Sequence, residues 1–255
     1  MTVAEVVAEV RSSRSRRAAR DAFGAGTLTL EEAYRVQRVL AEEREAAGDA
    51  IVGWKLGLIS AAKQEQMKVQ EPIIGHLHQG MLINPGEPLE RSRFIQPRLE
   101  PELGVVFGRD PSPGDTRGEL VRAVAFAVLA VDVLDSIYAG YRFGAADVVA
   151  DNASGGAVLL GSRPLPPGLL WRQEGGLRLS LDGGEWTEGA VAGLGDPARQ
   201  IAWGVERAAA LGRGVRRGDL LLLGAPCPAL TLGEGEPCMV VAEGPGASRL
   251  VASVV

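Results

Sequence analysis

The stretch Gln96-Pro97-Arg98-Leu99-Glu100-Pro101-Glu102-Leu103-Gly104-Val105-Val106 predicts a strand that carries two acids on one face. Side chains alternate between the two faces of a strand, so Glu100 and Glu102 are expected to point the same way. Two neighbouring carboxylates repel each other and resist burial. A divalent cation would remove both difficulties, because hard cations such as Mg²⁺ and Mn²⁺ take oxygen ligands.

A third acid stands alone in a later apolar run, Val128-Leu129-Ala130-Val131-Asp132-Val133-Leu134. An acid in such a run needs a partner or a shifted pKa. Glu100, Glu102 and Asp132 are therefore the candidate metal ligands. A second interpretation stays open, in which the Glu-x-Glu pair lies on a solvated strand face and Asp132 is a satisfied core acid.

Composition limits the classes of protein that fit. The 255 residues are enough for one large domain or two modest ones, and a hydrophobic content of 46% supports a real core. The 34 glycines and 15 prolines favour many turns over a helix bundle. The net charge of −5 argues against nucleic acid as a partner, and the basic cluster 11–17 is expected to be a solvated helix face.

Cysteine usage and hydropathy bear on the compartment. Cys227 and Cys238 form no Cys-x-x-Cys pattern, which disfavours redox or zinc chemistry. We find no signal peptide and therefore expect a cytoplasmic protein. The apolar run 121–134 is too short to span a bilayer and contains Asp132, so no membrane association is expected.

The pattern along the chain predicts an α+β protein. Helices are expected over 3–19, from a cap at Thr29 to Gly48-Asp49, from a cap at Ser60 to Met67, and over 197–211 after a cap at Asp196. Strands are expected at 51–58, 81–84, 93–96, 100–107, 124–134, 157–160, 177–181, 220–224, 237–242 and 248–254. The chain thus divides into a helical and mixed N-terminal segment, 1–90, and a β-rich, metal-binding body, 91–255.

Four stretches, in order and spacing, carry a family resemblance: 53–60 (Gly-Trp-Lys-Leu-Gly-Leu-Ile-Ser), 96–102, 131–136 and 149–154 (Val-Ala-Asp-Asn-Ala-Ser). From about Leu28 onward the chain resembles the hydratase/decarboxylase branch of the fumarylacetoacetate hydrolase superfamily. Enzymes of this branch act on 2-oxo acids in the bacterial meta-cleavage degradation of aromatic compounds. The resemblance implies a mixed β-roll with a helical N-terminal part.

The resemblance also implies roles for individual residues. It implies that Glu100, Glu102 and Asp132 bind Mg²⁺ (or Mn²⁺), although the family usually has the longer Glu at the third position. The metal would chelate the 2-oxo acid and stabilise an enolate as a Lewis acid. Lys55 would bind the substrate carboxylate or donate a proton, and Ser154 would hydrogen-bond that carboxylate.

The region around Pro72 separates the two branches. Hydratases of this type typically carry an acid directly after this proline, where this chain has Ile73. Glu71 is adjacent and is the candidate substitute acid, while Leu58 and Ile73 are expected to contact substrate. This favours 2-oxo-3-hexenedioate (4-oxalocrotonate) decarboxylase. The alternative is 2-oxopent-4-enoate (2-hydroxypenta-2,4-dienoate) hydratase, which the stretches 80–81 and 84–87 resemble more.

Further alternatives are an acylpyruvate-type C–C hydrolase and a non-catalytic partner subunit. The first needs a His-Glu pair in a short N-terminal helix, which is not evident, and the second conflicts with intact candidate site residues. The resemblance implies a homo-oligomer, with association between paired hydratase and decarboxylase. His76 and His78 match no family motif and are expected in a solvated loop.

Overall fold

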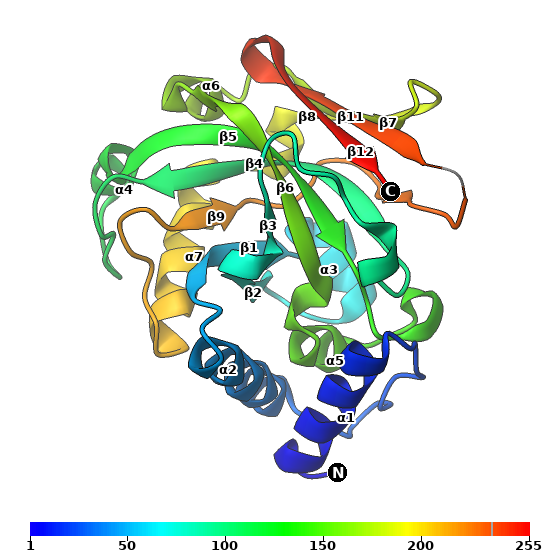
Figure 1. Cartoon of the computed structure of the whole chain (residues 1–255). Helices are drawn as coiled ribbons and strands as arrows, with labels where there is room; N and C mark the ends of the chain where they lie inside the picture. The colour runs from blue at the N-terminus through cyan, green and yellow to red at the C-terminus, as the bar shows by residue number, and fades with distance from the viewer. Residues whose placement is uncertain (236) are drawn as a thin grey trace.

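Two β-sheets organise the computed structural model, which describes residues 1–235 and 237–255 (Figure 1). The larger sheet combines parallel and antiparallel pairs, since β1 (Ile51–Gly57) pairs in parallel with β9 (Leu220–Leu222) and β3 (Leu82–Ile83) with β6 (Gly155–Leu165). The short strand β10 (Leu230–Thr231) pairs with β4 (Arg98–Phe107) outside the main strand order. The strand order is β2 (Ile73–His78), β1, β9, β4, β5 (Val124–Leu134), β6 and β3.

A smaller antiparallel sheet packs against β4, β5 and β6 of the larger one. Its order is β12 (Ser248–Val254), β11 (Cys238–Gly244), β7 (Gly176–Leu181) and β8 (Trp186–Ala190). In Figure 1 it covers one side of the large sheet, with the C-terminus at its edge. The other face of the large sheet is therefore not in contact with the small sheet.

Alternation along β4 and β5 divides the apolar side chains between these two faces. Leu103 and Leu129 belong to the main core, which includes the apolar residues of the small sheet. Val128 and Ala130 belong to a second buried cluster, together with Leu220 of β9. Asp132 is two residues from Ala130 on β5, and Glu102 is the direct partner of Ala130 across the two strands. The acids therefore lie on the same face of the sheet as this second cluster.

Helices cover the remaining surfaces. α1 (Val3–Arg16), α2 (Leu30–Ala46) and α5 (Ala145–Ala150) lie together at one end of the molecule (Figure 1), and α7 (Pro197–Ala210) contacts β1 and β2. Every helix among the described residues is too short or too polar to cross a lipid bilayer. Shorter helices are α3 (Ala61–Met67), α4 (Arg117–Ala123) and α6 (Pro167–Arg172), with 3₁₀ turns η1 (Gln79–Met81), η2 (Arg91–Arg93), η3 (Ala139–Tyr141), η4 (Asn152–Ser154), η5 (Val191–Leu194) and η6 (Pro245–Ala247).

The predicted α+β class, the mixed β-roll and the helical N-terminal part are confirmed. Predicted helix starts are also confirmed, because Thr29, Ser60 and Asp196 each accept a backbone N–H of the helix they precede. Strands from both sides of residue 90 pair in the large sheet. The division into segments 1–90 and 91–255 stays a prediction.

The predicted strand 93–96 is wrong. The chain there leaves η2 and runs on as an irregular segment, whose Ile95 and Gln96 N–H groups donate to one carboxylate oxygen of Asp135, each at 2.9 Å. A side chain thus takes the place of a neighbouring strand as the acceptor. Strands β2, β8 and β10 were not predicted.

The close approach of β1 to β9 generates a test of the sheet. A Cβ atom at Gly53 would lie 2.0 Å from the backbone oxygen of Leu220, whereas one at Gly214 would meet nothing within 4 Å. We expect Gly53→Ala to lower the free energy of unfolding by about 1–3 kcal/mol or more, and Gly214→Ala to leave it nearly unchanged. Denaturant unfolding measures both, and equal midpoints would contradict this strand pairing.

Candidate metal centre

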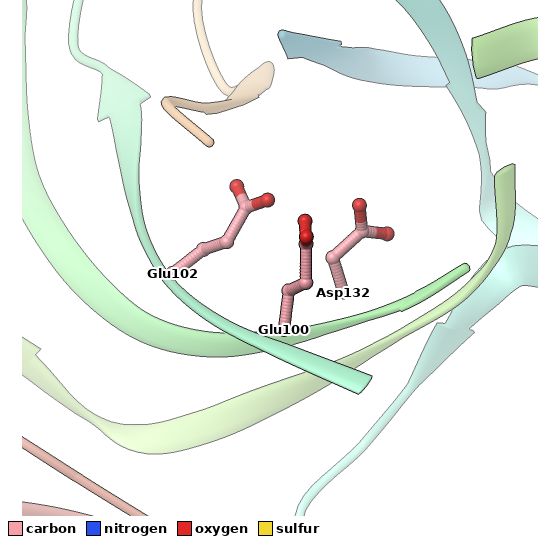
Figure 2. A group of neighbouring side chains, drawn as sticks. All are labelled: Glu100, Glu102 and Asp132. Atoms are coloured by element: carbon pink, nitrogen blue, oxygen red, sulfur yellow. The ribbon is translucent and has the colours of Figure 1, made fainter. Parts of the chain in front are cut away.

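Three carboxylates meet on the inner face of the large sheet. Glu100 and Asp132 are direct partners across β4 and β5, and Glu102 follows on the same face of β4. One oxygen from each lies within 4.8 Å of the others. Figure 2 shows the three side chains extending from the adjacent strands into a common space. Oxygen atoms at such separations can face one small, hard cation.

The three acids are withdrawn from water. The side chain of Glu100 is 12% exposed, and Glu102 and Asp132 are each 1% exposed. Burial raises the pKa of Glu100 and Asp132, and burial with the nearby Asp132 and Glu100 charges raises the pKa of Glu102 well above its usual range. Asp132 Oδ1 has no hydrogen-bond partner among the described residues. The buried acids thus favour a partner that supplies positive charge, as is expected of a cation site.

Lys55 supplies one cation beside the acids. Its Nζ lies 2.6 Å from Asp132 Oδ2, and both side chains are 1% exposed. The same Nζ donates to the backbone oxygen of Ala153 at 3.1 Å. Even together with Lys63 of α3, whose Nζ lies 3.5 Å from Glu100 Oε1, Lys55 does not balance three carboxylates, so a deficit of positive charge remains.

The turn η4 presents Ser154 next to this lysine. Asn152, Ala153 and Ser154 have φ values of 52°, 52° and 54°, a left-handed conformation that costs free energy in residues other than glycine. The Asn152 side chain fixes the turn to β2, accepting the His76 N–H at 2.7 Å and donating to the His76 oxygen at 2.9 Å. Ser154 Oγ is buried without a hydrogen-bond partner in the described chain. A strained turn holding an unpaired hydroxyl is typical of a binding site.

The other predicted site residues lie on β1, β2 and their loops. Ile73 is 2% exposed and pairs with Gly57 of β1. Leu58 directly follows β1 with a φ of 53°. Glu71 is bound instead to α7, through Arg207 at 2.9 Å and Trp203 Nε1 at 3.4 Å. The roles of Leu58, Glu71 and Ile73 stay predictions.

The expectation for the two histidines is wrong. His76 and His78 lie in β2 and are 3% and 1% exposed. His76 stacks on Trp54 with ring centroids 4.4 Å apart, and burial lowers the pKa of His76 to about 3, so its ring is neutral. No sequence signal marked this strand, because the two histidines match no family motif and the burial of β2 depends on its neighbours in the fold.

Two contacts to the acids were not predicted. Lys63 of α3 places its Nζ 3.5 Å from Glu100 Oε1, and the backbone N–H of Gly224 donates to Glu102 Oε2 at 2.8 Å. The only sequence signal for Lys63 was its place in a helix soon after the 53–60 motif. Gly224 gave none, because its contact depends on β9 lying beside β4.

This fold and this cluster define a class, a mixed β-roll protein with a candidate carboxylate metal centre. The chain belongs to the fumarylacetoacetate (FAA) hydrolase C-terminal family, which it matches over residues 34–255. The resemblance found in the sequence is therefore confirmed.

Individual relatives narrow the class further. A 2-keto-4-pentenoate hydratase of Burkholderia vietnamiensis (strain G4 / LMG 22486) is 35% identical, over 89% of this chain and 88% of the relative. A 4-oxalocrotonate decarboxylase of Pseudomonas sp is 32% identical, over 83% of this chain and 82% of the relative. Hydratase and decarboxylase are both lyases, so the predicted enzyme class is confirmed, and hydratase names are the more numerous.

Among solved structures, the 4-oxalocrotonate decarboxylase from Pseudomonas putida G7 is similar throughout. It aligns with a TM-score of 0.91 at 27% identity, covering 99% of this chain and 97% of the decarboxylase. That enzyme is complexed with magnesium and adipate. The buried acids of this chain form a group that could hold such an ion.

Replacing one acid separates metal binding from folding. Glu102→Gln removes a buried charge but keeps an oxygen for the Gly224 N–H, so the metal-free variant should be at least as stable as the parent. Mg²⁺ affinity should fall at least about 10–100-fold. Thermal melting with Mg²⁺ and with EDTA measures both, and Glu206→Gln, an exposed site on α7, is the control. An undiminished Mg²⁺ effect in Glu102→Gln would remove Glu102 from the ligands.

The effect of Mg²⁺ on stability should depend on pH. Because the folded-state pKa values of Glu102 and Asp132 are raised, their contribution favours the metal-free fold below the ordinary carboxyl pKa of about 4 and is lost as pH rises through the raised values. Mg²⁺ needs these groups deprotonated, so its stabilisation changes in the opposite direction. The melting difference between Mg²⁺ and EDTA should grow between about pH 5 and pH 8. A constant difference would contradict carboxylate ligation.

Proposed function

We propose that this chain is a metal-dependent lyase for 2-oxo acids of aromatic meta-cleavage degradation, and that its reaction is the decarboxylation of 2-oxo-3-hexenedioate. The names of its relatives support the 2-oxo acid substrate class. The choice of decarboxylation rests on one observation, the buried isoleucine at position 73.

The candidate centre fits Mg²⁺ or Mn²⁺ on chemical grounds. Glu100, Glu102 and Asp132 offer only oxygen donors, two of them nearly inaccessible to water, and Asp132 Oδ1 is buried and unpaired within the described chain. These three residues would hold the ion. When bound, it supplies a Lewis acid that takes up negative charge on the keto oxygen of a 2-oxo acid.

Lys55 and Ser154 are the proposed substrate-binding and catalytic groups. Lys55 Nζ sits between Asp132 and the Ala153 oxygen, where its remaining N–H can bind a substrate carboxylate. The Ser154 hydroxyl, which has no hydrogen-bond partner among the described residues, can donate to the same carboxylate. Both groups are buried, so water would not compete for the hydrogen bonds that they make to the substrate. Leu58 and Ile73 are proposed as apolar contacts to the substrate chain.

The bond changes in decarboxylation need no proton transfer at carbon. In 2-oxo-3-hexenedioate the bond between C5 and C6 breaks and CO₂ leaves. The electron pair forms C4=C5, the C3=C4 pair moves to C2=C3, and the charge arrives on the C2 oxygen. One proton on that oxygen completes 2-hydroxypenta-2,4-dienoate. An apolar wall suits this reaction, because loss of charge from the departing carboxylate is favoured where water is excluded.

Hydration makes a different demand. It adds a proton to one carbon and hydroxide to another, and an acid–base group has to handle both. Ile73 cannot do this, and the nearby Glu71 is held by Arg207 and Trp203 of α7. The side-chain chemistry near β2 therefore favours decarboxylation.

The second candidate is hydration of 2-hydroxypenta-2,4-dienoate. It is favoured by the relatives, among which hydratase names are more numerous and reach 35% identity against 32% for the decarboxylase. In this alternative Glu71 would leave α7 and act as the proton donor. Under either reaction we propose a cytoplasmic homo-oligomer that associates with the paired enzyme, since the decarboxylation product is the hydration substrate.

Two substrates separate the candidates. Purified protein with Mg²⁺ should release CO₂ from 2-oxo-3-hexenedioate and consume 2-hydroxypenta-2,4-dienoate at least about 100-fold more slowly, since it lacks the acid–base group. CO₂ release and loss of diene absorbance measure the two rates. Ile73→Asp, compared with Ile73→Asn as its uncharged match, should gain diene consumption. Diene loss by the parent without CO₂ release would establish the hydratase instead.

A further inference from the structure

A cavity lies apart from the acid cluster, between α1, α2 and the start of β6. Its volume is about 520 Å³, within the range of sites for metabolite-sized ligands. Its lining includes Asn152 and Gly155, but none of the proposed metal ligands, nor Lys55 or Ser154. The cavity thus belongs to the helical end of the molecule (Figure 1) and to no function assigned so far.

The lining is positively charged within an acidic protein. Five arginines surround the cavity against three carboxylates, although the whole chain has a net charge of −5. Such a concentration of guanidinium groups attracts anions and raises their local concentration. The arginines are Arg11, Arg14, Arg17, Arg44 and Arg93, and the acids are Glu43, Asp135 and Asp151.

The arginines differ in how far they are already neutralised. Arg14 bridges Asp135 and Asp151 at 3.1 and 2.5 Å, Arg11 pairs with Glu43, and Arg44 pairs with Asp49 outside the lining. Arg17 and Arg93, in contrast, have no carboxylate partner among the described residues. Arg93 only donates to the Gly80 oxygen at 3.3 Å and lies over the Phe94 ring. Arg17 and Arg93 are both exposed. Their guanidinium groups remain available to an anion.

Apolar side chains complete the cavity. Val10 of α1, Leu40 and Ala41 of α2, and Phe94 with Ile95 also line it. Inorganic phosphate would leave these groups uncovered, whereas a ligand with an apolar body would bury them favourably. We propose that the cavity binds a small organic carboxylate with an apolar body, whose carboxylate is held by Arg17 and Arg93.

The ligand would contact residues that support the η4 turn. The Ser154 N–H donates to the backbone oxygen of Asp151 at 2.9 Å, and the Asp135 N–H donates to the backbone oxygen of Ser154 at 2.7 Å. Both acids are held by Arg14 on the cavity side. The cavity therefore borders the residues that hold the η4 turn, whose Ala153 oxygen accepts from Lys55. A ligand bound in the cavity would act on the proposed lyase site through this turn.

Benzoate is a suitable probe, with one carboxylate and an apolar ring. With EDTA present, calorimetric titration should show benzoate binding to the full chain, about ten-fold weaker in the double variant Arg17→Gln, Arg93→Gln, since hydrogen bonds to charged groups are lost. Arg122→Gln, exposed on α4, is the control for loss of an arginine outside the cavity and should bind as the parent does. Glu102→Gln should also bind normally, which separates this site from the metal centre.

Each other outcome overturns the proposal. No binding to the parent would exclude the site, and equal affinity in the double variant would exclude the two arginines. Loss of binding in Glu102→Gln would assign benzoate to the metal centre. Inorganic phosphate binding as tightly as benzoate would exclude the role of the apolar wall. Circular dichroism of the double variant checks that the fold persists. None of these results depends on the lyase reaction.

Discussion

The register between β4 and β5 is the constraint on which the rest of the site depends. It sets Glu100 opposite Asp132, with Glu102 two residues further along the same face. Three acids gather where water hardly reaches, and among the described residues two lysines lie beside them, the buried Lys55 and the more exposed Lys63. A fold that buries so much negative charge is costly without more positive charge. That cost is reasonable if a divalent cation completes the cluster.

The surroundings of the acids also depend on pairing between strands that are distant in sequence. β9 brings the Gly224 N–H to Glu102, and β1 brings Lys55 to Asp132. The η4 turn then fixes Lys55 from the other side, and its left-handed backbone is held by β2 through Asn152. The candidate metal centre and the proposed substrate-binding groups thus form one network, and Ile73, which we propose favours decarboxylation, lies on the neighbouring strand β2.

The sequence predicted the local parts of this arrangement and missed the non-local ones. Alternation placed Glu100 and Glu102 on one face, and capping residues located the helix starts. Asp132 was grouped with them because it stands alone in an apolar run, and the family resemblance supported this grouping; no local pattern specifies the register that brings it opposite Glu100. His76 and His78 were wrongly expected in a solvated loop, because they match no family motif and no local pattern shows that β2 is buried, with the His76 ring against Trp54. The irregular segment after η2 was missed because Asp135, some 40 residues away, supplies its acceptor.

The most direct test of the central claim is to locate the ion. Crystals grown with Mn²⁺, measured for its anomalous scattering, should show one peak in direct contact with carboxylate oxygens of Glu100, Glu102 and Asp132, at distances of about 2.0–2.3 Å. Lys55 Nζ should remain outside the coordination shell, because an ammonium group has no free electron pair for a metal. A peak bound elsewhere, or intact protein without a peak at this cluster, would contradict the account.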